Sequence, residues 1–274
     1  MGSIRARDMR DQFEQSRRGL EAFDCDVWVG QPSEPCFRWF DTVGNLERFM
    51  DAAGISEALV THFAALNYDF AEGNELALQW AAESSRLHVA ITLVPDSVGE
   101  VGGMDAYLDR AIDRKARAVR LFPHAHSFSL AQWCSGPILD ALLRRNLPLI
   151  LWHSETTWDE INVICERYPD LNVIVEGSGR KILYDNRMFY QLLATHANLY
   201  LELHNLTNYL IVEDIVHKFG ARRLIFGSFA PLCEPGAPLG LIAQARISDA
   251  DKRLIAGGNQ RALLDHVGTG RARA

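Results

Sequence analysis

The chain has 274 residues, of which 48% are hydrophobic, and a formal net charge of −7. This length and apolar content suffice for the core of one large domain or two small ones. The acidic balance gives no general attraction to nucleic acid or to an anionic membrane, and no stretch approaches 18 apolar residues. We therefore expect a small molecule or a protein as partner, and neither nucleic acid nor membrane.

The N-terminal segment is charged, and it lacks the apolar stretch of a signal peptide. We expect residues 1–20 to form a helical arm ahead of a single domain over 21–274. The five cysteines are an odd number and include no C-x-x-C pair. This usage indicates free thiols and a reducing compartment, so we expect a cytoplasmic protein.

From residue 22 onward, short apolar runs alternate with segments of helical spacing. The eight runs are AFDCDVWV (22–29), SEALVTHF (56–63), LHVAITLVP (87–95), ARAVRLFP (116–123), LPLILWH (147–153), LNVIVEG (171–177), NLYLELH (198–204) and RRLIFGS (222–228). Eight strand–helix units in about 250 residues predict an α/β fold of the (β/α)8 TIM-barrel type. A doubly wound sheet is the alternative, because periodicity does not reveal whether a sheet closes.

Polar residues stand where these runs end. In a (β/α)8 barrel the active site lies at the carboxyl ends of the strands, so these residues are the site candidates. They are Asp24, Asp26, Trp28, His62, Arg120, His124, His126, His153, Glu155, Glu176, Arg180, Glu202, His204 and Ser228.

Several segments resemble the amidohydrolase-related family, often called amidohydrolase-2, of metal-dependent barrel hydrolases and decarboxylases. The resemblance covers residues 22–266. Its segments are FDCDVWVG (23–30), similar to the family's D-x-H-x-H-x-G first strand, ARAVRLFPHAHSFSL (116–130), LPLILWHSE (147–155), YPDLNVIVEGSG (168–179), RRLIFGSFAP (222–231), similar to F-G-S-D-x-P, and IAGGNQRALL (255–264). The resemblance implies a barrel with hydrolase or decarboxylase chemistry at its mouth.

The metal ligands that the resemblance implies are mostly replaced. The first-strand histidine positions hold Asp26 and Trp28, the sixth-strand histidine position holds Gly177, and the eighth-strand aspartate position holds Phe229. Only His153 remains. One histidine and one carboxylate fall short of the three protein ligands of a catalytic zinc, so we expect no metal and no other cofactor.

Four residues are the expected carriers of protons. Asp26 lies between aromatic residues, where a low dielectric raises the pKa of a carboxyl group, and His153 keeps a site position. His204 is a second acid or base, and Glu176 assists. For Asp26 the structural alternative is an ion pair with Arg120. For His153 it is the role of a hydrogen-bonded histidine in the core.

Six residues are expected to hold or orient the substrate. Arg120 and Arg180 suit a carboxylate, since a guanidinium donates two parallel hydrogen bonds to it. The other four are His124, His126, Trp28 and Glu155. Trp28 would offer a flat apolar wall in the former metal cavity, and Glu155 would fix the tautomer of His153.

The sequence thus predicts a metal-independent hydrolase, lactonase or lyase (decarboxylase) that acts on a small carboxylated or cyclic substrate. The alternative is a non-catalytic descendant that binds a ligand or a partner protein, which the loss of metal ligands favours. A third possibility is a zinc hydrolase with a rearranged site from Asp24, Asp26, His124, His126 and His153. A homodimer is an expectation from the fold alone.

Overall fold

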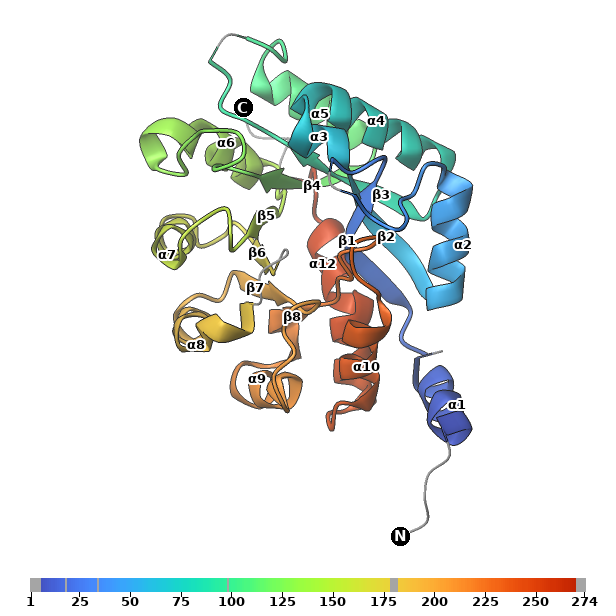
Figure 1. Ribbon diagram of the computed structural model, residues 1–274. Helices are drawn as coiled ribbons and strands as arrows, with labels where there is room; N and C mark the ends of the chain where they lie inside the picture. Colours follow the sequence, from blue (N-terminus) through green and yellow to red (C-terminus); the bar gives the residue numbers. More distant parts are fainter. Residues whose placement is uncertain (1–5, 18, 34, 98, 178–181, 270–274) are drawn as a thin grey trace.

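The computed structural model describes residues 6–17, 19–33, 35–97, 99–177 and 182–269, and in this part parallel strands alternate with helices around a barrel (Figure 1). The strands are β1 (Ala22–Val29), β2 (Ile55–His62), β3 (Leu87–Thr92), β4 (Ala116–Leu121), β5 (Leu149–Trp152), β6 (Val173–Glu176), β7 (Leu199–Glu202) and β8 (Leu224–Ile225). The α-helices are α1 (Ala6–Arg17), α2 (Val43–Ala53), α3 (Phe63–Asn67), α4 (Phe70–Glu83), α5 (Met104–Asp113), α6 (Gln132–Arg144), α7 (Trp158–Arg167), α8 (Asn186–Thr195), α9 (Ile211–Phe219), α10 (Gly236–Gln244), α11 (Asp249–Arg253) and α12 (Asn259–Leu264). Short 3-10 helices η1 (Ile182–Asp185) and η2 (Ala221–Arg223) and the π-helix η3 (Leu254–Gly258) complete the described elements.

The strands follow one another in chain order around the sheet, β1 to β8, and every neighbouring pair is parallel. The segment that follows β8 returns to β1. Cys25 N donates to Phe226 O at 3.1 Å, and Trp28 N donates to Ala230 O at 2.7 Å. These bonds bring the two edges of the sheet together, so the predicted (β/α)8 barrel is confirmed.

Two apolar layers enclose the strands. Inside the barrel, the side chains of Phe23, Cys25, Leu59, Ala90, Ala118, Ile150, Ile174 and Ile225 form a buried cluster. On the outer face, a larger cluster joins the strands to the surrounding helices. Strands buried on both faces explain why the sequence shows continuous apolar runs in place of strict alternation.

Strand β1 contains an irregularity that matters for the site. Its register against β2 shifts between Asp24 and Val27, as in a β-bulge. The consecutive residues Cys25 and Asp26 both accept hydrogen bonds from Arg120, which lies inside the barrel: Cys25 through its carbonyl oxygen and Asp26 through its side chain. The bulge therefore interrupts the alternation of the strand where its polar residues begin.

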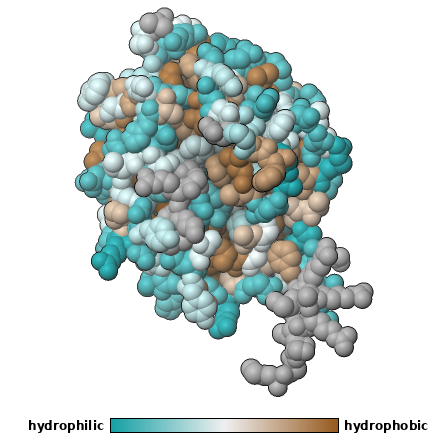
Figure 2. Space-filling view, viewed as in Figure 1, coloured by the Kyte–Doolittle hydropathy of each residue, from teal (hydrophilic) through white to brown (hydrophobic). Residues whose placement is uncertain are grey.

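Helix α1 precedes the barrel and packs on it. Phe13 is partly buried against the outer core, and Arg17 donates to Ala52 O at 3.1 Å. On the face shown in Figure 2, hydrophilic side chains predominate and apolar ones form separate patches. Among the helices described, none combines the length and apolar character that crossing a membrane requires.

Candidate functional site

Five ionisable side chains from four strands meet inside the mouth of the barrel. Asp26 comes from β1, Arg120 from β4, Glu176 from β6, Glu202 from β7, and His204 from the turn just after β7. We call these five residues the buried polar cluster. The three acids are 0% exposed, Arg120 is 1% exposed and His204 is 6% exposed, so the cluster belongs to the interior.

Arg120 is the central cation of the buried polar cluster. Its Nε donates to Thr61 Oγ1 at 2.9 Å, and its Nη2 donates to Cys25 O and Asp26 Oδ1, both at 3.0 Å. Its Nη1 donates to Glu176 Oε2. One guanidinium thus links β1, β2, β4 and β6.

The two carboxylate oxygens of Asp26 have different surroundings. Oδ1 accepts hydrogen bonds from Arg120 and from the indole Nε1 of Trp28, the latter at 2.9 Å. Among the residues that the structure describes, Oδ2 is buried and accepts no hydrogen bond, and His204 Nδ1 lies 3.7 Å from it. A buried carboxylate oxygen in this state is unusual, because burying an unsatisfied polar atom is unfavourable.

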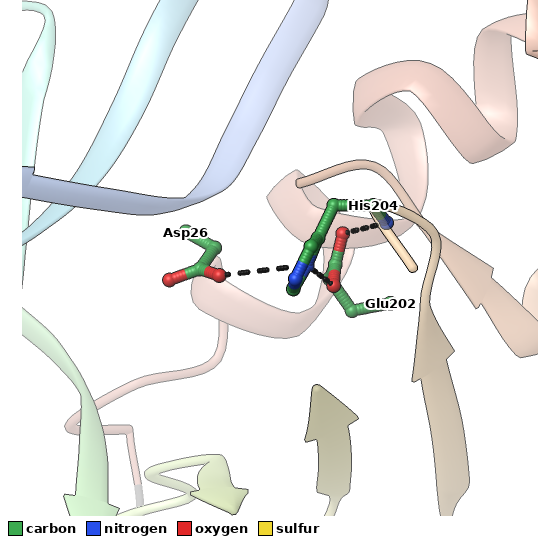
Figure 3. A group of neighbouring side chains, drawn as sticks. All are labelled: Asp26, Glu202 and His204. Atoms are coloured by element: carbon green, nitrogen blue, oxygen red, sulfur yellow. Dashed lines mark hydrogen bonds and ion pairs between the residues drawn. The ribbon is translucent and has the colours of Figure 1, made fainter. Parts of the chain in front are cut away.

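Glu202 holds His204 at two points (Figure 3). The backbone N–H of His204 donates to Glu202 Oε1 at 2.5 Å, and the ring Nδ1 bonds to Oε2. A Cβ at Gly227 would lie 2.7 Å from Glu202 Cγ. The glycine of the FGS segment therefore makes room for this carboxylate.

The electrostatics of the mouth follow from burial. Burial raises the pKa of Asp24 to about 7, although Ser228 and the backbone of Asp26 donate hydrogen bonds to it. Burial also raises the pKa of Asp26 and of Glu176, and in both cases it outweighs the lowering effect of Arg120. For Arg120 the neighbouring carboxylates outweigh burial, so its pKa is raised and it stays charged.

Aromatic rings stand at two of the positions where the family resemblance places metal ligands, those of Trp28 and Phe229. Trp28, Phe63, Phe122 and Phe229 are buried together, and Trp152 packs against them. The Trp28 and Trp152 ring centroids are 5.2 Å apart, and Phe229 stacks on His204 at 5.0 Å. These rings offer a cation no side-chain ligand atom, whereas Asp26 and His153, at two other such positions, each carry one.

His153 lies at the edge of this buried region, beside an open cavity. Its ring Nδ1 is 3.2 Å from Glu176 O, and its backbone N–H donates to the same oxygen at 3.1 Å. The cavity has a volume of about 640 Å³. It is lined by His153, Thr156, Thr157, Trp158, Asp159, Tyr184, Asp185 and Met188.

The other residues predicted for the site lie farther out. Glu155 Oε2 accepts the backbone N–H groups of His124 and Ala125, both at 2.9 Å, so it holds the loop after β4. The His124 side chain is exposed, and His126 Nε2 is 3.0 Å from Leu66 O. Arg180 lies outside the described residues.

Two residues that bond to the buried polar cluster or belong to it are not among the acids, bases and binding residues that we expect from the sequence. Thr61 Oγ1, which donates to Ala90 O, receives the Nε hydrogen bond of Arg120. A threonine near the end of an apolar run gives no signal of such a role. Glu202 did give one, because it lies two residues before His204 and alternates with Tyr200 on one face of a strand.

Comparison with known proteins supports the family resemblance that the sequence motifs indicate. The model of the family described as Amidohydrolase (Amidohydro_2) matches residues 46–265. Comparison with curated proteins gives no match.

The similar solved structures share the fold. A 5-carboxyvanillate decarboxylase of Novosphingobium aromaticivorans, solved with manganese and a nitrobenzoic acid, has a TM-score of 0.72 at 12% identity, covering 90% of this chain and 98% of that one. A probable 2-pyrone-4,6-dicarboxylic acid hydrolase of Acinetobacter baumannii, with citric acid bound, has a TM-score of 0.67 at 14% identity, covering 90% and 100%. A 2,6-dihydroxybenzoate decarboxylase of Rhizobium has a TM-score of 0.65 at 14% identity, covering 90% and 99%. The barrel, its mouth and the match over residues 46–265 together identify the chain as a member of the amidohydrolase-2 family.

Proposed function

We propose that the chain is an enzyme that transfers a proton through His153 to or from a small carboxylated or cyclic substrate, as a lyase or a hydrolase. The single observation that supports this most is the position of His153, which lies between the Glu176 carbonyl and the open cavity. Proton transfer by a positioned histidine is a general means of catalysis at neutral pH.

The hydrogen bond of His153 fixes its tautomer. A carbonyl oxygen only accepts, so Nδ1 of a neutral ring carries the proton that points at Glu176 O. The lone pair is then on Nε2, which makes this nitrogen the base. Glu176 is a positioning residue in this account, through its backbone carbonyl. Glu155, bonded to the loop after β4, is not needed for that purpose.

The proposed reaction uses no metal. Trp28, Phe229 and Gly177 stand at three of the family's ligand positions and offer no side-chain donor to a cation. Glu176 connects the buried polar cluster to His153. Its backbone carbonyl is bonded to the His153 ring, and its carboxylate accepts a hydrogen bond from Arg120. We assign the sequence-predicted Asp26 and His204 to this supporting group.

The substrate class rests on the walls of the cavity and on the family. Trp158, Tyr184 and Met188 offer apolar surface to a ring, and Thr156 and Thr157 offer hydroxyl groups. A volume of about 640 Å³ is within the range of small-molecule sites. Decarboxylases of aromatic acids and a hydrolase of a cyclic dicarboxylic acid, all with this fold, point to small carboxylated or cyclic compounds.

A panel of aromatic acids, small carboxylic acids and lactones tests the proposal. Each compound is incubated with the full chain and followed by proton NMR. We expect conversion of at least one compound, and a loss of about 100- to 10,000-fold in kcat for His153→Asn. The matched control is His124→Asn, which changes an exposed histidine after the neighbouring strand and should keep the rate. Full activity in His153→Asn would contradict the proposal.

A second candidate function is ligand binding without catalysis. The observation that favours it is the presence of Trp28, Gly177 and Phe229 at three of the family's ligand positions, because none of them offers a side-chain ligand to a catalytic cation. Binding of panel compounds, measured by the shift of the thermal unfolding midpoint, without conversion of any of them would favour this candidate.

A further inference from the structure

A second cavity, which we call the basal cavity, lies at the end of the barrel opposite the mouth. It has a volume of about 400 Å³, and its lining includes Asn146, Asn172, Tyr200, Arg222, Asn259 and His266. The first four lie just before or at the start of β5, β6, β7 and β8, and the other two belong to α12 and the turn after it. The amino-terminal ends of four strands therefore form one side of the basal cavity, and α12 forms the other.

Helix α12 lies against β1 and β8 at this end of the barrel (Figure 1). Leu263 of α12 belongs to the apolar cluster inside the barrel, and the ring of Tyr200 packs against the same cluster. After the helix, the backbone N–H of Gly268 donates to Arg145 O at 2.8 Å. Both sides of the basal cavity are therefore anchored to the barrel, so a ligand does not have to order a loop in order to bind.

Two amide side chains offer hydrogen-bond acceptors to the basal cavity. Asn259 Nδ2 donates to Ala221 O and Leu224 O, both at 2.8 Å. Asn146 Nδ2 donates to two oxygens of the turn after α12, at 3.1 and 3.4 Å. Because an amide nitrogen has two hydrogens, the oxygen Oδ1 is the atom that each of these side chains keeps for a ligand. These two oxygens require a partner that donates, such as a hydroxyl group.

The basal cavity is positively charged, although the chain as a whole carries a formal net charge of −7. None of the described residues that line it is acidic, and Arg222 is exposed there. The neighbouring Arg223 donates to Leu199 O and His196 O, whereas the guanidinium of Arg222 has no such bond to another described residue. Burial raises the pKa of the Tyr200 hydroxyl group, and Arg223 and Arg222 oppose this shift, so both charges act inside the cavity. Arg222 is therefore available to an anion.

We propose that the basal cavity binds a small sugar phosphate, with its phosphate on Arg222 and its hydroxyl groups donating to Oδ1 of Asn146 and Asn259. The guanidinium donates parallel hydrogen bonds to phosphate oxygens, and the Tyr200 hydroxyl group and the Asn172 amide are further donors. A phosphate group suits these three side chains because it carries about two negative charges and three acceptor oxygens. A bare anion would leave the two amide oxygens without a donor, and a neutral sugar would leave the guanidinium without an anion.

This site is separate from the proposed catalytic one. The basal cavity shares no lining residue with the cavity beside His153, and its volume of about 400 Å³ is within the range of small-molecule sites. The acids and lactones proposed as substrates contain no phosphate, so the basal cavity takes a second compound. Bound there, this compound joins α12 to the starts of β5 to β8 and stabilises the folded state, and it takes no part in proton transfer.

Isothermal titration calorimetry of the full chain with glucose 6-phosphate and ribose 5-phosphate tests the proposal. We expect at least one of them to bind, at least about tenfold more tightly than glucose, ribose or inorganic phosphate, because each of these lacks part of the contacts. Arg222→Met should weaken this binding at least about tenfold, and Tyr200→Phe by about 2- to 10-fold. The matched control is Arg246→Met, which removes another exposed arginine that does not line the cavity and should keep the affinity.

A structure of the unaltered chain with the bound sugar phosphate supplies a reading that needs no variant. We expect a phosphate oxygen within hydrogen-bonding distance of the Arg222 guanidinium. The proposal would be overturned by the absence of binding of both compounds, by unchanged affinity in a folded Arg222→Met, or by a sugar phosphate located beside His153. None of these readings depends on turnover, so their outcome is separate from that of the proposed function.

Discussion

Arg120 pairs with two buried carboxylates at the barrel mouth, those of Asp26 and Glu176. It is 1% exposed and bonds to two buried carboxylates, a carbonyl and a hydroxyl group. Removing one partner of a buried ion pair leaves the other charge uncompensated in a low dielectric. The stability of the barrel should therefore depend strongly on this side chain.

Arg120→Met is expected to lower the free energy of unfolding by about 3–5 kcal/mol, because Asp26 and Glu176 lose their cation. Urea unfolding measures this difference. The control is Arg114→Met, whose pair with Glu75 is 44% exposed on both sides and should contribute at most about 1 kcal/mol. Equal small losses in the two variants would show that the buried pair is not stabilising.

His88 gives a prediction for pH. Burial lowers its pKa below the ordinary 6.5, although Glu57 partly opposes the shift. The folded state therefore favours the neutral ring, so this contribution to stability is present above pH 6.5 and is lost as the pH falls through the lowered pKa. We expect wild type to lose stability relative to His88→Gln between pH 7 and 5, by urea unfolding. A difference between the two that stays constant over this range would be inconsistent with the shift.

At the scale of single residues, the sequence indicated most of the charged groups of the mouth but only one pair among them, the ion pair of Asp26 with Arg120 that was its structural alternative. The resemblance placed Asp26, Arg120 and His153 at strand ends, and all three lie there. It could not show that the Arg120 donors are used inside the protein, because those bonds cross from β4 to β1, β2 and β6. Contacts between residues distant in sequence depend on the closed barrel, which no local pattern specifies.

At the scale of elements, helix α7 forms one wall of the cavity beside His153. Its first turn is fixed by a capping box, in which Thr157 Oγ1 accepts from Glu160 N at 3.2 Å and Glu160 Oε2 accepts from Thr157 N at 2.9 Å. The T-x-x-E pattern is visible in the sequence. The bulge of β1 is not, since it depends on the register against β2.

Thr157→Ala is expected to destabilise the chain by about 1 kcal/mol, because the backbone N–H of Glu160 loses its acceptor at the start of α7. Thr157→Ser, which keeps the hydroxyl group, serves as the control and should lose much less. Chemical denaturation of the three proteins gives the comparison. Equal loss in the two variants would mean that packing of the methyl group, and not the cap, determines the effect.

At the scale of the whole molecule, the number and order of strand–helix units predicted the architecture correctly. Eight apolar runs with helices between them indicate a barrel, because each strand–helix unit is visible locally as an apolar run followed by a segment of helical spacing. Closure is different. It depends on the bonds of Cys25 to Phe226 and of Trp28 to Ala230, between segments at opposite ends of the domain.

The central claim is that the substrate site lies at the mouth, against His153. The most direct measurement is a structure of the chain with the panel compound that binds most tightly. We expect the compound in the cavity beside Trp158 and Tyr184, with a polar atom within hydrogen-bonding distance of His153 Nε2. A compound bound away from His153, for example in the cavity of about 400 Å³ lined by Tyr200, Arg222 and His266, would contradict the claim.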